Sequence, residues 1–425
     1  MKCFLEKKDK EDKTSFYFRF VPEEDDKTEG TSYNAGKNKI MLLKSDEKDG
    51  SVVASFDFPF SITLPHNDLC AMAALKIISP YIGSEFEMVG MPVSHTFANA
   101  VYEKYPNIKI INASSLTAPR MIIGEKYAVS FSGGADSVAV ADLMPYGTPL
   151  ILSSRKYHDA VGEFEPWFST DANIKTLQDM PDRFVKINVR SDFEFLSTNG
   201  SYCIYPDNYS FTIPCILLAD HLGLTGIYSG DILAAFTAEE TRKVSFINFN
   251  KMKNYYRSAG LDFDSPVKGV TEIGTEIINS FYGTSEITTT CQYGKYKQPC
   301  MKCIKCFRKT LIKAYINKHT PDDSILADFN KNVAVSGFLE RNKDREPFPF
   351  GFTYNEILKK LDLSNYELLN KIKNKSACDM DTSFLNKVLV SAYYKNDMSL
   401  TMQHCLNNLL KIFDVMTLEE EAYFF

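Results

Sequence analysis

Short apolar runs alternate with helical patterns along the middle of the chain. The apolar runs predict four strands, at 127–131, 148–154, 183–189 and 226–231. Between some of them, apolar residues recur at helical spacing, over 135–144 and 213–223. Strands that alternate with helices in this way are typical of a parallel sheet covered on both faces. We therefore predict an α/β fold with a doubly wound parallel sheet.

The first part of the chain has a different pattern. It predicts strands at 17–21, 39–44, 51–58 and 108–114, and helices at 67–83 and 95–106. Residues 6–13 are so rich in charge that we expect them to be solvated. These features predict an α+β module over 1–120, with no motif that assigns it a role.

The last part of the chain is dominated by amphipathic patterns. Apolar residues at positions i, i+3 and i+4 predict helices at 354–363, 364–374, 383–395 and 400–416. We therefore predict three regions: the module of residues 1–120, the α/β domain of 121–320 and a helical region of 321–425. The two end regions carry no chemistry that we identify, so docking of a protein partner is a role open to them.

The composition is that of an ordinary globular protein, with 44% hydrophobic and 24% charged residues. The net charge of −6 gives no overall attraction to nucleic acid, so we expect no nucleic-acid partner. No apolar run approaches the roughly 18 residues that a membrane helix needs. The charged N-terminus also lacks the apolar segment of a signal peptide. We expect a cytoplasmic protein that binds no membrane.

The sharpest chemical signal is an SGGADS turn that begins at Ser132, after a predicted strand and before a predicted helix. Gly133 and Gly134 allow the backbone to approach a ligand closely, and successive N–H groups at a helix N-terminus bind anions. Ser132 and Ser137 add hydroxyl donors. Asp136 would repel a phosphate unless a divalent cation lay between them. The turn therefore suits ATP with bound Mg²⁺, with Asp136 as a metal ligand or next to one.

A second signal is a dense group of cysteines: Cys291, Cys300, Cys303 and Cys306 fall within one short segment. In a reducing compartment such clustering indicates metal more often than disulfides. Four thiolates fill the tetrahedral positions of Zn²⁺, which predicts a structural site. An iron–sulfur cluster is the main alternative.

The turn matches the SGGxDS signature of the PP-loop ATP pyrophosphatases. Together with the cysteines it resembles the 7-cyano-7-deazaguanine synthases of queuosine biosynthesis, over about 125–315. The segments YPDNYSFTIPCILLADHLGLTGIYSGDI and SPVKGVTEIGTEIINSFYG are similar to stretches of that family. The resemblance implies the HUP-like fold of adenine nucleotide alpha hydrolases. It also implies an ATP and Mg²⁺ site at the turn, and zinc ligands at the four cysteines.

Three further candidates lie near predicted strand ends or in the segment before the cysteines. Arg155 is a candidate for binding the nucleotide or a substrate carboxylate, with a solvated turn as the alternative. Asp231 closes the fourth strand, as a ligand of Mg²⁺ or of a substrate amine, or as a helix N-cap. Lys268 is a candidate for neutralising charge at the phosphates, with a solvated face as the alternative. We count Asp136, Asp231 and Lys268 as candidate catalytic residues.

Other residues are weaker candidates. Lys156 and His158 accompany Arg155 after the second strand. Cys203 or Cys215 would have to carry sulfur if the enzyme were a sulfurtransferase. A basic patch around the metal site would contact RNA or balance the thiolates, and it comprises Lys302, Lys305, Arg308 and Lys309.

These motifs predict an ATP-dependent C–N ligase that adenylates a small-molecule carboxylate, releases pyrophosphate and passes the acyl group to an amine donor. By resemblance, the carboxylate belongs to a 7-carboxy-7-deazaguanine-like base, for amide or nitrile formation or for conjugation. Two alternatives stay open. One is a tRNA sulfurtransferase of the PP-loop type, and the other is a nucleotide-sensing scaffold of an anti-phage or surface-sugar operon.

Overall fold

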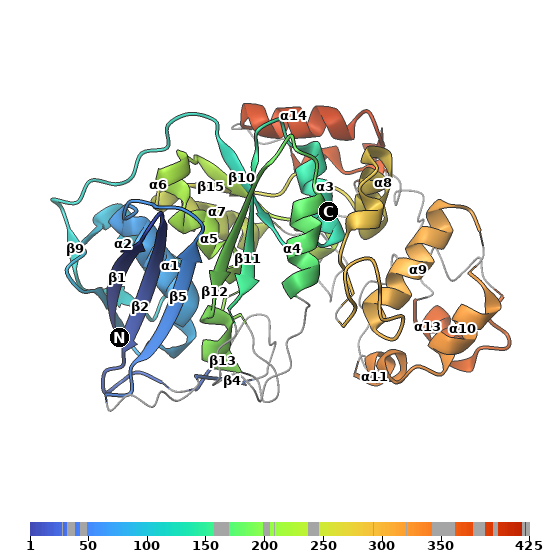
Figure 1. Ribbon diagram of the computed structural model, residues 1–425, viewed down its shortest axis with the longest axis horizontal. Coiled ribbons are helices and arrows are strands. Elements are labelled where there is room, and N and C mark those ends of the chain that lie inside the picture. Colours follow the sequence, from blue (N-terminus) through green and yellow to red (C-terminus); the bar gives the residue numbers. More distant parts are fainter. Residues whose placement is uncertain are drawn as a thin grey trace.

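Figure 1 shows the protein as a computed structural model. The structure describes residues 1–27, 29–31, 39–42, 49–156, 170–198, 205–207, 209–236, 246–291, 293–319, 321–341, 362–376, 387–393, 398–418 and 421.

A ten-stranded sheet runs through the molecule. Its neighbouring strands are parallel from β15 to β12, antiparallel from β12 to β1, and parallel again from β1 to β8. The fold is therefore mixed α/β with a large, mostly parallel central sheet. In spatial order the strands are β15 (Asp262–Asp264), β14 (Gly226–Tyr228), β10 (Tyr127–Phe131), β11 (Pro149–Arg155), β12 (Val185–Ser191), β5 (Val52–Phe58), β2 (Lys13–Val21), β1 (Lys2–Lys10), β6 (Glu85–Met88) and β8 (Lys109–Ile110).

Helices flank the parallel strands, which are short and almost fully buried, as the apolar runs predict. In Figure 1, α3, α4 and α8 lie on one side of β10–β12, and α1, α5 and α7 lie on the other. Their bounds are α1 (Asn67–Ile78), α3 (Ala135–Leu143), α4 (Thr170–Asp179), α5 (Ile213–Leu217), α6 (Ala219–Leu222), α7 (Ile247–Ser258) and α8 (Glu272–Tyr282).

The N-terminal strands form a hairpin whose inner face is aromatic. Phe16, Phe18 and Phe20 alternate along β2 and are fully buried, as expected for a strand with one face in the core. Residues 6–13 are exposed, as expected, but the sequence did not predict that residues 6–10 belong to a strand, β1, which pairs with β2 along its whole length. Pairing satisfies the backbone of β1, while its charged side chains stay exposed. The remaining N-terminal elements are α2 (His95–Lys104), β3 (Glu29–Thr31), β4 (Lys39–Leu42), β7 (Val93–Ser94) and β9 (Ala113–Ser114), and β13 (Ser197–Thr198), from later in the chain, pairs with β4.

The sheet crosses the predicted boundary near residue 120, because β5 pairs with β12. Next to this pairing, the N–H and the hydroxyl of Ser55 donate to the two carboxylate oxygens of Asp192, both at 2.6 Å. Lys156 Nζ also lies 3.0 Å from Asp57 Oδ2. The first 120 residues and the α/β domain therefore share one sheet, and the division into three regions stays a prediction.

The C-terminal region is mostly helical in the described residues, but the predicted helix at 383–395 is wrong. Residues 387–388 form a strand that pairs with β17 (Asp414–Val415), and Leu389 N–H donates to Gly269 O at 2.9 Å. These bonds to distant segments replace the local bonds of a helix, and the helix predicted at 400–416 ends at Leu409. The elements are α9 (Ile304–Ile316), α10 (Asp323–Asn330), α11 (Val333–Arg341), α13 (Glu367–Ser376), β16 (Lys387–Val388) and α14 (Leu400–Leu409).

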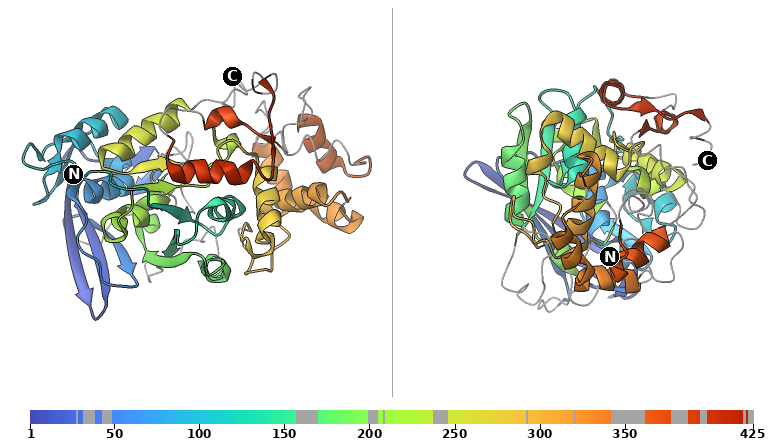
Figure 2. Two further views of the ribbon diagram at one scale, coloured as in Figure 1. Left: turned by 90° about the horizontal axis from the view of Figure 1, so that it is seen from above. Right: turned by 90° about the vertical axis from the view of Figure 1, so that its right-hand side faces the viewer.

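The last long helix returns to the α/β domain. Figures 1 and 2 show α14 beside α3, far from the other C-terminal helices. Asn408 Nδ2 donates to the carbonyl of Leu143 at the end of α3, at 3.1 Å, and Thr401 Oγ1 donates to the carbonyl of Glu125 at 3.2 Å. Among the helices of the described ranges, none has the length and hydropathy of a membrane-spanning segment.

A buried ion pair joins the N-terminal elements to the α/β domain. Lys76 Nζ on α1 is fully buried and lies 3.1 Å from Asp207 Oδ1. Tyr105 OH also donates to Asp207, at 3.2 Å, and the ring of Tyr256 lies 4.8 Å from the ammonium. A buried carboxylate that loses its cation is strongly destabilising. Removal of the charge on Lys76 therefore tests how much this ion pair contributes to holding the two parts together.

We predict that Lys76→Met lowers the free energy of unfolding by about 3–5 kcal/mol, because it leaves Asp207 buried without a cation. Urea denaturation measures this change. Lys109→Met is the matched control, since the Lys109 side chain is 73% exposed and 3.9 Å from Glu85. It should cost less than about 1 kcal/mol. Equal effects of the two substitutions would contradict the assignment.

Candidate functional site

A cavity of about 720 Å³ opens at the carboxyl ends of β10, β11 and β14. From β10 the sheet continues to β11 and β12 on one side and to β14 and β15 on the other. Such a reversal of strand order is where parallel sheets bind ligands, and the volume lies within the roughly 300–1,000 Å³ of ligand pockets. Its walls are the turn after β10, the ends of β11 and β14, and helices α8 and α9.

The SGGADS turn forms one wall of the cavity. Gly134 is the N-cap residue of α3, and no side chain caps the helix there. Ser137 Oγ donates to Gly134 O at 3.0 Å and lies 3.1 Å from Ser132 Oγ. The N–H groups of Ala135 and Asp136 lie in the first helical turn, where the helix supplies no acceptor. The wall is therefore a helix N-terminus of the kind that attracts anions.

Two glycines let other segments touch this turn. Gly133 has a φ of +75°, and a Cβ there would lie 3.2 Å from Thr176 Cβ. The carbonyl of Gly133 accepts a hydrogen bond from the N–H of Thr289 at 2.7 Å. A Cβ at Gly230, after β14, would lie 3.0 Å from the backbone nitrogen of Ser137. The turn is therefore held between α4, the segment before the cysteines and the end of β14.

Asp136 is partly buried at the start of α3, where helix α8 holds it. Thr275 Oγ1 donates to Asp136 Oδ1 at 2.8 Å, and Asn279 Nδ2 donates to the carbonyl of Ala135 at 3.0 Å. Burial, and then the nearby carboxylate of Glu272, raise the pKa of Asp136 to about 6. A bound cation would favour the charged form of this carboxylate.

The wall formed by α8 and α9 carries both acidic and basic side chains. Lys305, Arg308 and Lys309 share one face of α9, because they are three and four residues apart, and all three line the cavity. Arg308 forms an ion pair with Glu272, and Lys309 Nζ lies 3.2 Å from Glu276 Oε2. Burial lowers the pKa of both lysines. The wall can therefore bind an anion if the glutamates release their partners.

Arg155 and Asp231 lie at the cavity, as the strand ends predict. Arg155 contacts Glu194 through two nitrogens, one of them Nη2 at 3.3 Å from Oε1. Asp231 accepts a hydrogen bond from Ser229, and burial raises its pKa to about 6. The structure places both side chains where a bound molecule can reach them, and their roles stay predictions.

Other candidates lie elsewhere. Lys268 Nζ is 2.7 Å from Asp264 Oδ1 in a separate cavity of about 40 Å³, so the structure does not bring it to the SGGADS turn. Lys156 pairs with Asp57, and Lys302 is exposed. Cys215 is buried on α5, and burial raises its pKa to about 12. Two candidates lie outside the described residues, His158 and Cys203.

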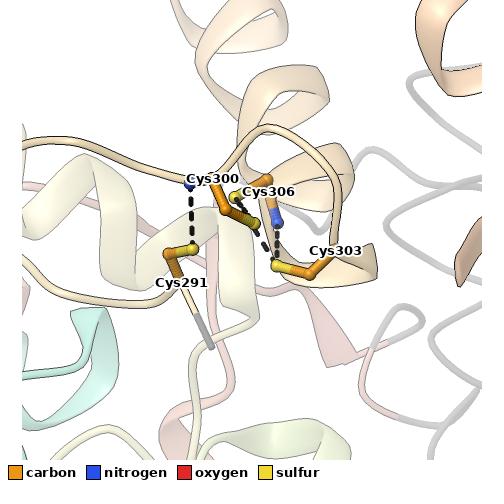
Figure 3. A group of neighbouring side chains, drawn as sticks. All are labelled: Cys291, Cys300, Cys303 and Cys306. Carbon is orange, nitrogen blue, oxygen red and sulfur yellow. Dashed lines mark hydrogen bonds between the residues drawn. The ribbon is translucent and has the colours of Figure 1, made fainter. Parts of the chain in front are cut away.

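Figure 3 shows the four cysteines turned toward one another. Their sulfur atoms all lie within 4.8 Å of one another, with Cys303 Sγ at 3.5 Å and Cys300 Sγ at 3.9 Å from Cys306 Sγ. Tetrahedral zinc with bonds of about 2.3 Å places its sulfur atoms about 3.8 Å apart. The N–H groups of Gly294 and Cys300 also donate to Cys291 Sγ, at 3.0 and 3.2 Å. The cluster fits a metal such as zinc.

The cysteine cluster connects two segments that line the cavity, one ending at Thr290 and one starting at Lys305. Cys303 is the N-cap residue of α9, and its sulfur accepts from the N–H of Cys306. Lys305 is therefore in the first turn of α9, directly before Cys306 of the cluster. On the other side, Thr289 precedes Cys291 and bonds to Gly133. A metal held by the cysteines would fix the start of α9 relative to the SGGADS turn.

Sequence reasoning missed three residues of this site. Thr275 and Glu276 sit on α8 with Glu272, and the i, i+4 spacing of the two glutamates was a usable signal. Glu194 gave no local signal. It reaches Arg155 because the turn after β12 lies beside the end of β11.

Residues 251–424 match the model of a family of unknown function, DUF6395. The match covers less than half of the 425 residues. It includes α8, α9, the four cysteines and α14, and it leaves out the SGGADS turn. No curated protein matches the chain.

We predict that Cys303→Ser lowers the bound metal to less than a tenth of an equivalent, because it removes one of four thiolates and the cap of α9. Metal analysis of the purified protein measures this, and it also separates zinc from an iron–sulfur cluster. Cys405→Ser is the control, since Cys405 is a buried thiol outside the cluster. Equal metal contents in both variants would show that the cysteines hold no metal.

We predict that Asp136→Asn raises the free energy of unfolding at pH 7.5 by up to about 3 kcal/mol. The pKa of Asp136 in the folded protein is about 6, above its value in the unfolded chain, so stability falls as pH rises through 6 and the carboxyl ionises. Asparagine cannot ionise, and its advantage should therefore shrink at pH 4.5.

Urea denaturation at the two pH values measures the effect of Asp136→Asn. Asp182→Asn is the matched control, because the Asp182 side chain is fully exposed, and it should change stability by less than about 0.5 kcal/mol at both pH values. A gain for Asp136→Asn that is larger at pH 4.5 than at pH 7.5 would contradict the prediction.

Proposed function

We propose that the protein is an ATP-dependent ligase of the PP-loop type, which adenylates a carboxylate and joins the acyl group to an amine. The observation that carries this proposal is that the SGGADS turn and the cations of α9 line the same cavity. The strand order β12-β11-β10-β14-β15, with helices on both sides, supports a doubly wound fold with the turn at its switch point.

ATP binds with its β- and γ-phosphates on the turn. The N–H groups at the start of α3 and the hydroxyls of Ser132 and Ser137 donate to the phosphate oxygens. The carboxylate of Asp136 would hold Mg²⁺, and the ion would neutralise charge at the pyrophosphate. The ribose and adenine extend toward the ends of β11, where Arg155 lies.

The reaction proceeds in two balanced steps. A carboxylate oxygen of the substrate forms a bond to the α-phosphorus, and the bond from that phosphorus to the bridging oxygen breaks. Pyrophosphate leaves with the electron pair. The amine nitrogen then attacks the acyl carbon, and AMP leaves as the amide forms. Asp231, whose pKa is about 6, accepts the proton from the attacking amine.

The substrate that is adenylated is a small carboxylate that fits the rest of the 720 Å³ cavity. A 7-carboxy-7-deazaguanine-like base is the candidate that the family resemblance supports. Sulfur transfer through Cys215 is less well supported, because its buried thiol, with a pKa of about 12, is neutral at physiological pH. A scaffold that only senses nucleotide would use the same turn, and product analysis separates it from a ligase.

We predict that the protein with ATP, Mg²⁺ and a panel of carboxylates and amines forms AMP and pyrophosphate in equal amounts. Asp136→Asn should lower the rate at least about 100-fold, because it removes the charged Mg²⁺ ligand at the leaving group. Asp182→Asn should leave the rate unchanged. Chromatography of the nucleotides measures the products, and formation of ADP and orthophosphate would overturn the proposal.

A further inference from the structure

We propose that Lys305, Arg308 and Lys309 form a pyrophosphate-binding wall opposite the SGGADS turn, a role that rests on the proposed function and extends it. The turn alone supplies neutral donors and a helix N-terminus. The wall supplies the positive charge that a leaving pyrophosphate needs. The binding group is thus split between two elements far apart in the sequence, α3 and α9.

The placement of the three side chains carries this inference. They lie on one face of α9 and line the same cavity as the turn. The Arg308 side chain is 12% exposed and the Lys309 side chain 19% exposed. Cations that are mostly covered in this way suit a small anion inside the cavity better than the surface contacts that RNA would need.

The partners of these cations indicate how an anion would bind. Arg308 and Lys309 pair with Glu272 and Glu276 of α8. Lys302, the member of the basic patch that is exposed, does not line the cavity. Phosphate oxygens can replace the glutamates, since guanidinium binds phosphate with two parallel hydrogen bonds.

The ion pairs also explain how the wall is stable before the anion enters. Three partly buried cations without counter-charge would be unfavourable. Glu272, Glu276 and the nearby Asp136 provide that charge. When pyrophosphate takes over the cations, the released carboxylates face the cavity and attract the Mg²⁺ that accompanies the phosphates.

Titration of the full chain with inorganic pyrophosphate and Mg²⁺ by calorimetry tests the wall without any catalysis. We expect Lys305→Met and Arg308→Gln each to weaken pyrophosphate binding at least tenfold, and Arg308→Lys to keep part of the affinity. Lys313→Met is the matched control. Lys313 lies one turn further along α9, pairs with Glu286 at 2.8 Å, and does not line the cavity. Its affinity should stay within twofold of that of the unaltered protein.

A variant that fails to fold is distinguished by thermal unfolding. In that case, Arg308→Gln combined with Glu272→Gln removes both charges of the pair, and it should fold normally while binding pyrophosphate weakly. The wall is overturned if the unaltered protein does not bind pyrophosphate, or if both single variants bind it within twofold. It is also overturned if AMP, rather than pyrophosphate, loses affinity.

The outcome separates this inference from the proposed function. A protein that binds pyrophosphate through the wall, yet releases none from ATP with any acceptor, would retain the wall and lose the ligase assignment. If the variants release pyrophosphate from ATP as fast as the unaltered protein does, the ligase assignment stands and the pyrophosphate-binding wall is overturned.

Discussion

The site depends on helix α8, which balances charge on one side and fixes the SGGADS turn on the other. Thr275 and Asn279 donate to Asp136 and Ala135 at the start of α3. From the same helix, Glu272 and Glu276 reach the cations of α9. Because unpaired buried charges are costly, a displacement of α8 would disturb both walls together. The helix is therefore a rigid spacer between the two halves of the cavity.

The cysteine cluster stabilises a part of the chain that has few other constraints. The segment from Cys291 to Cys303 contains short turns, with positive φ angles at Lys297 and Met301. Such a segment buries little apolar surface, and a metal held by the cysteines would offset the entropy lost when it is ordered. The position of the cluster matters for the cavity, because α9 starts next to Cys303 and carries the three cations that line the cavity.

The sequence was informative where a local pattern decides the structure. The SGGADS turn, its strand and its helix follow from adjacent residues, and the cysteine spacing predicts the cluster that the structure brings together. Pairing between distant segments was not predictable. Residues 6–13 carry charge that favours solvent, yet β2 supplies their partner strand. The pattern at 383–395 is helical in isolation, but bonds from Gly269 and β17 replace the helix.

Site residues follow the same rule. Asp231 and Arg155 were predicted to be at the cavity because the ends of parallel strands meet at one end of the sheet. Lys268 lies in a segment next to the site, but its ammonium pairs with Asp264 in another cavity. Nothing in the local sequence marks this choice, since it depends on how β15 and the following turn lie beside β14.

In the shared sheet, the N-terminal strand β5 pairs with the edge of the α/β domain's parallel strands. Strand β12 pairs with β11 on one side and with β5 on the other. A chain shortened to begin after β5 would leave one side of β12 without a partner, and exposed strand edges recruit strands from other molecules. The N-terminal region thus covers part of this strand edge, at Arg190 and Ser191, independently of any ligand in the cavity.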